Sequence, residues 1–286
     1  MCIRDRTKAK VEDLKSQGRL PKIAMFGGSV FLFPHPVKEL ADFLKSHDMP
    51  INYDAAHVAG LIAGGKFQDP LREGTDTMTM STHKTLFGPQ GGLVLGFEKH
   101  AESIKKAMFP GLTSSHHIHH MAAKAVAFAE ALEFGKEYAS QTIKNAKALA
   151  AALNDMGFKV LGEKNGYTES HQAVVNVLDY GDGGKIEADL EKANIIVNRQ
   201  LIPGDLKAKR HYMHPGGIRL GTSEITRLGM KEPEMKEIAS MIKDVVIDKK
   251  DPNEITGKVA EFRKEFQKTQ YCFDNKLGAY EYVKLR

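Results

Sequence analysis

Two residues of opposite charge follow predicted strands in the first third of the chain. Lys84 lies in the segment Ser-Thr-His-Lys-Thr at 81–85, after a strand-like run at 76–81. Asp54 ends an earlier strand-like run at 50–54. An amine can hold the aldehyde of pyridoxal 5′-phosphate (PLP) as a Schiff base, and a carboxylate can keep the pyridine nitrogen of that cofactor protonated. The pair therefore indicates PLP chemistry.

The surroundings of Lys84 decide between a functional lysine and a solvated surface lysine. A surface position is the ordinary interpretation of any single lysine, which is protonated at neutral pH. Here the segment Gly-Pro-Gln-Gly-Gly at 88–92 follows, and such a loop lets the backbone approach a ligand closely. His83 is adjacent, although successive residues of an extended segment point in opposite directions. The glycine-rich loop favours the functional interpretation of Lys84.

Asp54 and His57 have a structural interpretation beside the functional one. A carboxylate at a buried strand end needs a partner, which a pyridinium nitrogen or the start of a helix at 55–63 could provide. In that helix His57 would lie one turn from Asp54, near the same ring or in a structural hydrogen bond. Ser29 follows another predicted buried strand, at 21–26. In parallel α/β sheets ligands bind beyond the carboxyl ends of the strands, so Ser29, Asp54 and Lys84 would share one edge.

Arg219 stands in a strand-like run flanked by glycines, Gly-Ile-Arg-Leu-Gly at 217–221. A guanidinium there requires a partner, and its bidentate fork suits an amino-acid carboxylate. A buried salt bridge to an acidic side chain is the equally good structural interpretation.

The histidine-rich segment at 116–120 could be read as a metal site. No Asp, Glu or Cys accompanies it, so we predict no metal and favour a polar loop that leads into a helix. The N-terminus of that helix would favour an anion such as a phosphate.

Composition excludes several classes of protein. The chain has 286 residues, 42% of them hydrophobic and 27% charged, and a net charge of +5. That charge is too mild to predict nucleic-acid binding, and no run approaches the roughly 18 apolar residues of a membrane helix. Two cysteines and the lack of a secretion signal predict a cytoplasmic protein. A GxxxxGK loop, a GxGxxG loop after a strand and a GxSxG elbow are all missing from the sequence.

The order of elements predicts an α/β fold with two domains. Strands at 21–26, 50–54, 76–81 and 91–97, with a helix at 37–47, predict a parallel sheet. A long helix at 118–156 would connect this large domain, residues 1–150, to a smaller α+β domain, residues 151–286. In the smaller domain we expect strands at 159–161, 173–178, 195–197 and 217–221, and helices at 185–193, 233–246 and 253–268.

Several segments, in this order along the chain, resemble the serine hydroxymethyltransferase family. The resemblance begins near Thr7 and reaches the C-terminal region. The segments that carry it are 54–63 (Asp-Ala-Ala-His-Val-Ala-Gly-Leu-Ile-Ala), 81–86, 88–92, Phe-Pro-Gly at 109–111, 122–128 (Ala-Ala-Lys-Ala-Val-Ala-Phe) and 217–222.

The resemblance implies a fold-type I PLP-dependent transferase, with a partial large domain and a smaller C-terminal domain. Such an enzyme interconverts serine and glycine and passes the hydroxymethyl carbon to a reduced pterin, within one-carbon metabolism. It further implies a homodimer. The roles that it implies are the catalytic Schiff-base lysine for Lys84, the pyridinium partner for Asp54, a catalytic position beside the cofactor ring for His57, and cofactor-binding positions for His83 and Ser29. It also implies the substrate carboxylate for Arg219, and contact with the phosphate of the neighbouring subunit's cofactor for Ser115.

Two segments depart from the common pattern of the family. Residues 113–117 replace a Gln-Gly-Gly-Pro type of loop, and 28–36 differ from the bacterial form; both, together with 223–227, look closer to the archaeal branch. For this reason the pterin could be of the tetrahydrofolate or the tetrahydromethanopterin type.

The start of the chain lacks segments that the family has. Members carry a sizeable N-terminal piece with a phosphate-binding Ser-Gly loop, a histidine stacked on the ring and a Tyr/Glu pair, and residues 1–20 hold none of these. We expect that the chain begins mid-domain, as an N-terminally truncated member. The alternatives are a PLP-dependent aldolase for threonine-type β-hydroxy amino acids and an inactive fragment.

Overall fold

The computed structural model describes residues 3–276 and 278–279. The chain forms two compact units, Met1–Glu133 and Phe134–Arg286, called the N-terminal and C-terminal units below. The long predicted helix is present as α6, Ile118–Asp155, and it runs from the first unit into the second. The domain boundary that we place after residue 150 stays a prediction.

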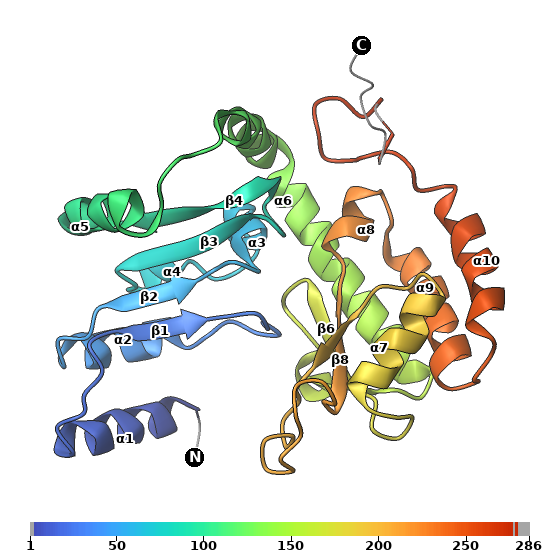
Figure 1. The fold of residues 1–286 in the computed structure, drawn as a ribbon, viewed down its shortest axis with the longest axis horizontal. Coiled ribbons are helices and arrows are strands. Elements are labelled where there is room, and N and C mark those ends of the chain that lie inside the picture. Colours follow the sequence, from blue (N-terminus) through green and yellow to red (C-terminus); the bar gives the residue numbers. More distant parts are fainter. Residues whose placement is uncertain (1–2, 277, 280–286) are drawn as a thin grey trace. The chain divides into compact units, whose positions relative to one another are not determined.

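The N-terminal unit is built on a four-stranded sheet with strand order β1-β2-β3-β4 (Figure 1). Strands β1, β2 and β3 are parallel, and β4 is antiparallel to β3. The bounds are β1 Ala24–Gly27, β2 Ile51–Asp54, β3 Thr77–His83 and β4 Phe87–Gly96, with α1 Ile3–Ser16, α2 Val37–Lys45, α3 Ala59–Ala63, α4 Pro70–Glu73, η1 Glu98–His100, α5 Ala101–Lys106 and η2 Ala107–Leu112.

The sheet is therefore mixed, whereas the sequence pattern predicts a parallel one. Only residues 84–86 separate β3 from β4. A parallel neighbour needs a crossover of about a dozen residues or more. A connection as short as this one can therefore only join antiparallel strands. The predicted burial of β1 is also wrong in part, because 66% of the Met25 side chain is exposed.

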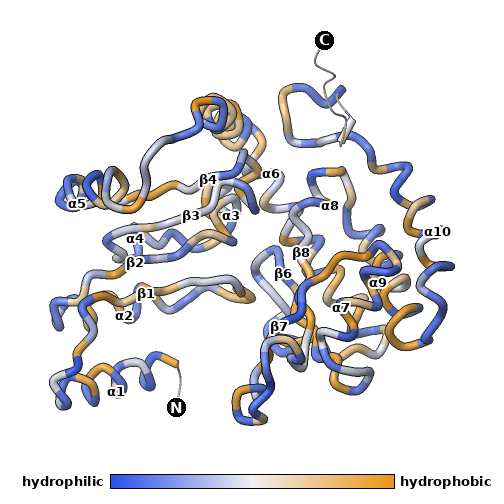
Figure 2. The backbone as a smooth tube through the Cα atoms, viewed as in Figure 1, coloured by the Kyte–Doolittle hydropathy of each residue, from blue (hydrophilic) through white to orange (hydrophobic). Residues whose placement is uncertain are grey.

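Helix α2 packs one face against the sheet. Hydrophobic and hydrophilic residues alternate along α1 and α2 (Figure 2), and the apolar positions of α2 recur with the helical period. They form a buried cluster with α1 and β2, made of Val11, Leu40, Ala41, Leu44, Met49 and Ile51. This cluster anchors β2, whose last residue is Asp54.

The C-terminal unit is an α+β unit, as expected. Its antiparallel sheet has the order β5-β6-β8-β7. Buried apolar side chains from the sheet, α6, α7, α9 and α10 form one core. The bounds are β5 Lys159–Val160, η3 Glu163–Asn165, β6 Gln172–Asn176, α7 Gly183–Lys192, β7 Asn198–Gln200, β8 Gly217–Gly221, α8 Ser223–Arg227, α9 Glu232–Val246 and α10 Pro252–Arg263.

Two elements of this unit differ from the sequence-based expectation. The strand predicted at 195–197 begins later, at Asn198, and the last helix ends at Arg263 instead of residue 268. Across residues 3–276 and 278–279, no helix is long and apolar enough to cross a membrane.

Candidate active site

The carboxyl ends of β1, β2 and β3 bring three of the predicted site residues to one edge of the sheet. Gly27, the last residue of β1, pairs in register with Asp54, the last residue of β2. Asp54 in turn pairs with Thr79 of the parallel strand β3, which continues to His83. Lys84 follows directly. Parallel strands end at the same edge, so Lys84 and Asp54 both lie at this edge of the sheet.

Asp54 is half-buried, and its side chain makes a local bond. Its Oδ1 atom accepts a hydrogen bond of 3.0 Å from the backbone N–H of Ala56. The expected helix at 55–63 is wrong at its start, because α3 begins only at Ala59. His57 is therefore in the turn between β2 and α3, close along the chain to Asp54 but not one helical turn above it.

Thr85 ties the segment that carries Lys84 to this turn. Its hydroxyl donates a hydrogen bond of 2.8 Å to the carbonyl oxygen of His57 and accepts one of 3.0 Å from the N–H of Gly60. The side chain is 1% exposed. Two bonds made by one buried hydroxyl fix the backbone next to Lys84 against the backbone of His57.

Replacing Thr85 with valine is expected to destabilise the chain by about 2 kcal/mol, because the variant leaves a buried N–H and a buried carbonyl group without their partner. Replacing Thr85 with serine keeps the hydroxyl and should cost roughly half as much, through the lost methyl group. The chain contains no tryptophan, so urea unfolding is best followed by circular dichroism. Equal losses for valine and serine would show that the hydroxyl does not hold these two segments together.

Lys84 is exposed and makes no hydrogen bond or ion pair with any residue that the structure describes. The hairpin beside it is braced by His83, whose Nδ1 atom accepts a hydrogen bond of 3.3 Å from the N–H of Gly91. A Cβ atom on Gly91 would lie 2.5 Å from Nζ of Lys124 and 3.2 Å from the Thr82 hydroxyl oxygen. The glycine thus leaves room for a second ammonium group beside the hairpin.

Ser29 and Ser115 are both exposed residues of the N-terminal unit. Ser29 follows Gly27 and Gly28 at the carboxyl end of β1, and therefore lies at the same edge as Asp54. Ser115 lies just before α6 begins at Ile118, and no described contact joins it to the other predicted site residues.

Arg219 belongs to the C-terminal unit, at the centre of β8. Its Nη2 atom donates a hydrogen bond of 3.2 Å to Oδ1 of Asn198 on the neighbouring strand β7. Burial lowers the pKa of the Arg219 guanidinium, and the nearby Tyr212 hydroxyl opposes that effect. The carboxylate role of Arg219 and its alternative, a salt bridge to an acidic side chain, both stay predictions.

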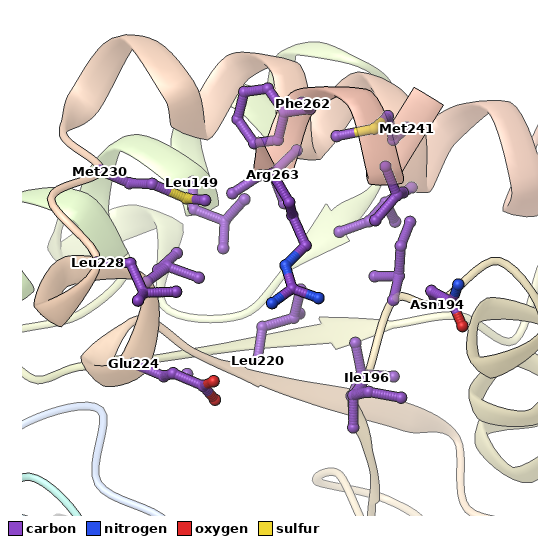
Figure 3. Close-up of a pocket in the computed structure, with 17 residues that line it drawn as sticks. Leu149, Asn194, Ile196, Leu220, Glu224, Leu228, Met230, Met241, Phe262 and Arg263 are labelled. Carbon is purple, nitrogen blue, oxygen red and sulfur yellow. The ribbon is translucent and has the colours of Figure 1, made fainter. Parts of the chain in front are cut away.

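The C-terminal unit also contains a cavity of about 600 Å³ that includes no predicted site residue (Figure 3). Apolar side chains such as Leu149, Met230 and Phe262 line it, and Glu224 and Arg263 are its charged residues. Its apolar lining offers no amine for an aldehyde. Among the described residues, no group of three or more His, Cys, Asp or Glu side chains could hold a metal ion, including the histidines at 116–120.

The edge of β1–β3 fits PLP in its chemistry. It offers an accessible amine, a half-buried carboxylate, and a backbone approach at Gly27 so close that a Cβ atom would lie 2.1 Å from the Asp54 carbonyl oxygen. The three parallel strands, the long helix and the C-terminal α+β unit define the class: the chain has the fold of the fold-type I PLP-dependent transferases.

Comparison with known proteins gives the family. The family profile described as serine hydroxymethyltransferase matches residues 7–242. A serine hydroxymethyltransferase of Nitrosopumilus maritimus is 79% identical and one of Cenarchaeum symbiosum 74% identical, each over 99% of this chain. The chain belongs to the serine hydroxymethyltransferase family, and it resembles archaeal members. It spans 64% of the length of each of these two relatives.

A solved structure supports the fold. The crystal structure of L-threonine transaldolase from Pseudomonas fluorescens in the internal aldimine state has a TM-score of 0.83 and 33% sequence identity. The match covers 94% of this chain and 61% of that protein.

Several residues that stabilise the site were not predicted from the sequence. Thr85 and Gly60 belong to segments that we singled out, but only the structure reveals the bond between them. His35 lies in the segment 28–36, which we singled out only for its departure from the bacterial pattern, and Gln68 lies outside every segment that we singled out. A single histidine in a largely apolar stretch does not by itself predict a functional role.

Proposed function

We propose that this chain is the PLP-binding and substrate-binding part of a serine hydroxymethyltransferase. The enzyme interconverts serine and glycine and transfers the hydroxymethyl carbon to a reduced pterin of the tetrahydrofolate or tetrahydromethanopterin type. The observation that carries the proposal is the common edge of Asp54, His57 and Lys84, joined through Thr85. Family membership and the 79% identity to a serine hydroxymethyltransferase support it.

Each predicted residue has a defined task in this proposal. The Lys84 Nζ atom binds the cofactor's aldehyde carbon, and the Asp54 carboxylate holds a proton on the pyridine nitrogen. His57, His83 and Ser29 surround the cofactor. The Arg219 guanidinium binds the substrate carboxylate, and in doing so orients the bond that breaks between the α and β carbons. When bound, PLP supplies an electron sink for the carbanion that this cleavage produces.

A homodimer is part of the proposal. Apolar side chains around the start of α6 are exposed, with Phe109 64%, Leu112 85% and Ile118 75% accessible. Exposed apolar side chains gathered in one segment are typical of an interface. In a dimer Ser115 would contact the phosphate of the partner's cofactor. We further propose that the protein works in the cytoplasm and requires neither nucleic acid nor membrane.

An aldolase for β-hydroxy amino acids is the second candidate. The L-threonine transaldolase to which this chain is similar favours it, since that enzyme's name also describes chemistry on a β-hydroxy amino acid. An inactive fragment is the third possibility.

Glycine formation from serine, measured with PLP and with each pterin in turn, separates the three candidates. We expect turnover of serine that depends on a reduced pterin. Turnover of threonine alone, unaffected by pterin, would identify the aldolase. Absence of turnover with either amino acid would identify the inactive fragment.

A further inference from the structure

The turn that follows β1 is packed tightly against the residue that carries the site's carboxylate. Gly27 and Gly28 both adopt positive φ, +93° and +142°, a region that side chains other than glycine rarely adopt. The backbone of Gly27 touches that of Asp54 so closely that even a methyl group would not fit between them. The position of Ser29 therefore depends on what holds this turn in place.

The side chain of His35 holds it. The backbone N–H of Gly27 donates a hydrogen bond of 3.2 Å to Nδ1 of His35. Since Nδ1 accepts, it carries no proton, and the ring is the neutral tautomer protonated at Nε2. The imidazole is half-buried and stacks on Phe31, with ring centroids 4.9 Å apart and an angle of 28° between the planes.

Gln68 fixes the backbone of His35 in turn. The side-chain Oε1 of Gln68 accepts a bond of 2.8 Å from the N–H of His35, and its Nε2 donates one of 3.0 Å to the His35 carbonyl oxygen. The same amide accepts from the Tyr53 hydroxyl at 2.7 Å and donates to Glu73 at 2.6 Å. Gln68 is only 9% exposed. The four hydrogen bonds of this buried amide fix the backbone of His35, from which its ring reaches the N–H of Gly27.

We propose that neutral His35 is a positioning residue that holds the turn of Gly27, Gly28 and Ser29 at the cofactor edge, and that protonation of its imidazole releases this turn. The hydrogen bond needs an acceptor at Nδ1. A protonated ring has N–H groups at both nitrogens, so Nδ1 would then face the N–H of Gly27 as a second donor. The contact between this turn and the bound cofactor rests on the proposed function, whereas the hydrogen bond between His35 and Gly27 does not.

The groups packed around the ring favour the neutral form at neutral pH. Burial lowers the pKa of His35. Burial raises the pKa of the Tyr53 hydroxyl, an effect strengthened by Glu73 and Asp54, so this neighbour stays uncharged. The Glu73 carboxylate is bonded to the amide of Gln68 and not to the imidazole. The pKa of His35 in the folded chain lies below the value of about 6.5 for an unfolded histidine. The hydrogen bond from Gly27 to His35 is therefore present above that pH and is lost as the pH falls through the folded pKa.

Two variants separate the hydrogen bond from the packing of the ring. His35→Asn keeps an acceptor, its Oδ1 atom, near the position of Nδ1 and cannot titrate in this range. His35→Phe keeps an aromatic ring against Phe31 and has no acceptor. A purely structural ring would tolerate phenylalanine better than asparagine, whereas the proposed tie requires the opposite order.

The first measurement needs no cofactor. Nuclear magnetic resonance of the full chain follows the Gly27 amide against pH. In the wild type we expect a chemical-shift inflection below pH 6.5, which is absent in His35→Asn. In His35→Phe we expect exchange of this amide to be roughly fivefold faster, as for loss of one ordinary hydrogen bond. An unchanged Gly27 amide in His35→Phe, or the absence of a pH inflection in the wild type, overturns the proposal.

The second measurement is the dissociation constant for PLP between pH 5 and pH 8. We expect His35→Phe to bind about fivefold more weakly at pH 8 and His35→Asn to remain near the wild type. At acid pH the wild type should lose this factor and His35→Asn should not. Equal PLP binding by all three proteins at every pH overturns the link to the cofactor edge. If none of the three proteins binds PLP while the Gly27 amide behaves as expected, the proposed function fails and the role of the His35 hydrogen bond in holding the turn stands.

Discussion

Replacing Lys84 with alanine is expected to abolish the visible absorbance that PLP gains on covalent attachment to a lysine. The physical reason is the position of Lys84 in the fold. Lys84 directly follows β3 at the edge that holds Asp54, and its amine makes no hydrogen bond or ion pair within the described residues. Without that amine the aldehyde has no covalent anchor. Absorbance spectra of the two proteins at equal PLP concentration measure the effect.

Two other lysines serve as controls. Lys66 is an exposed lysine in the loop after α3, so Lys66→Ala should keep the full absorbance. Lys124 lies close to Gly91 in the hairpin, so Lys124→Ala tests whether a neighbouring amine can replace Lys84. An unchanged band in Lys84→Ala together with a lost band in Lys124→Ala would assign the attachment to Lys124.

Replacing Gly60 with alanine is expected to cause a large loss of stability. The new Cβ atom would lie 2.0 Å from the carbonyl oxygen of Thr85 and 2.3 Å from its carbonyl carbon. These are backbone atoms of the segment beside Lys84, so relief requires that segment to move. Overpacking of this kind costs about 3 kcal/mol, measured as the free energy of unfolding in urea.

Gly257 provides a matched control for the same substitution. It lies inside α10, and a Cβ atom there would meet nothing within 4 Å. Gly257→Ala should therefore stabilise the chain by about 0.5–1 kcal/mol, because alanine favours a helix. Gly60→Ala should in addition weaken PLP binding, whereas Gly257→Ala should not. Equal stability of the two variants would show that α3 and the Lys84 segment are not packed as described.

The sequence was sufficient to place Asp54 and Lys84 at one edge, because strand ends can be read from apolar runs and the residues that follow them. The direction of β4 was predicted wrongly, because β4 is antiparallel to β3. The glycines at 88–92 made the loop look like a break before the strand, whereas in the structure Phe87–Gly96 is continuous. A helix at 55–63 with Asp54 as its cap would have placed His57 one turn from Asp54, yet the bond from Ala56 to Asp54 lies in a turn that lasts until α3 begins at Ala59.

The hydrogen bonds that stabilise the site could not be predicted from the sequence, because they join residues far apart in the chain. Gln68 bonds to His35, and Thr85 bonds to His57 and Gly60. Such pairs depend on how α3 and the turn after β1 pack on the sheet, and polar side chains of these types are common everywhere. Arg219 was found for the opposite reason: a charged residue within an apolar strand is rare enough to be noticed.

In the proposed function, Lys84 is the residue to which PLP attaches. Chemical reduction of the PLP-loaded chain with borohydride makes the bond permanent, and peptide mass spectrometry then locates it. We predict a pyridoxyl group on the peptide that contains Lys84 and on no other lysine peptide. A pyridoxyl group on Lys124 or any other lysine, with Lys84 unmodified, would contradict the account.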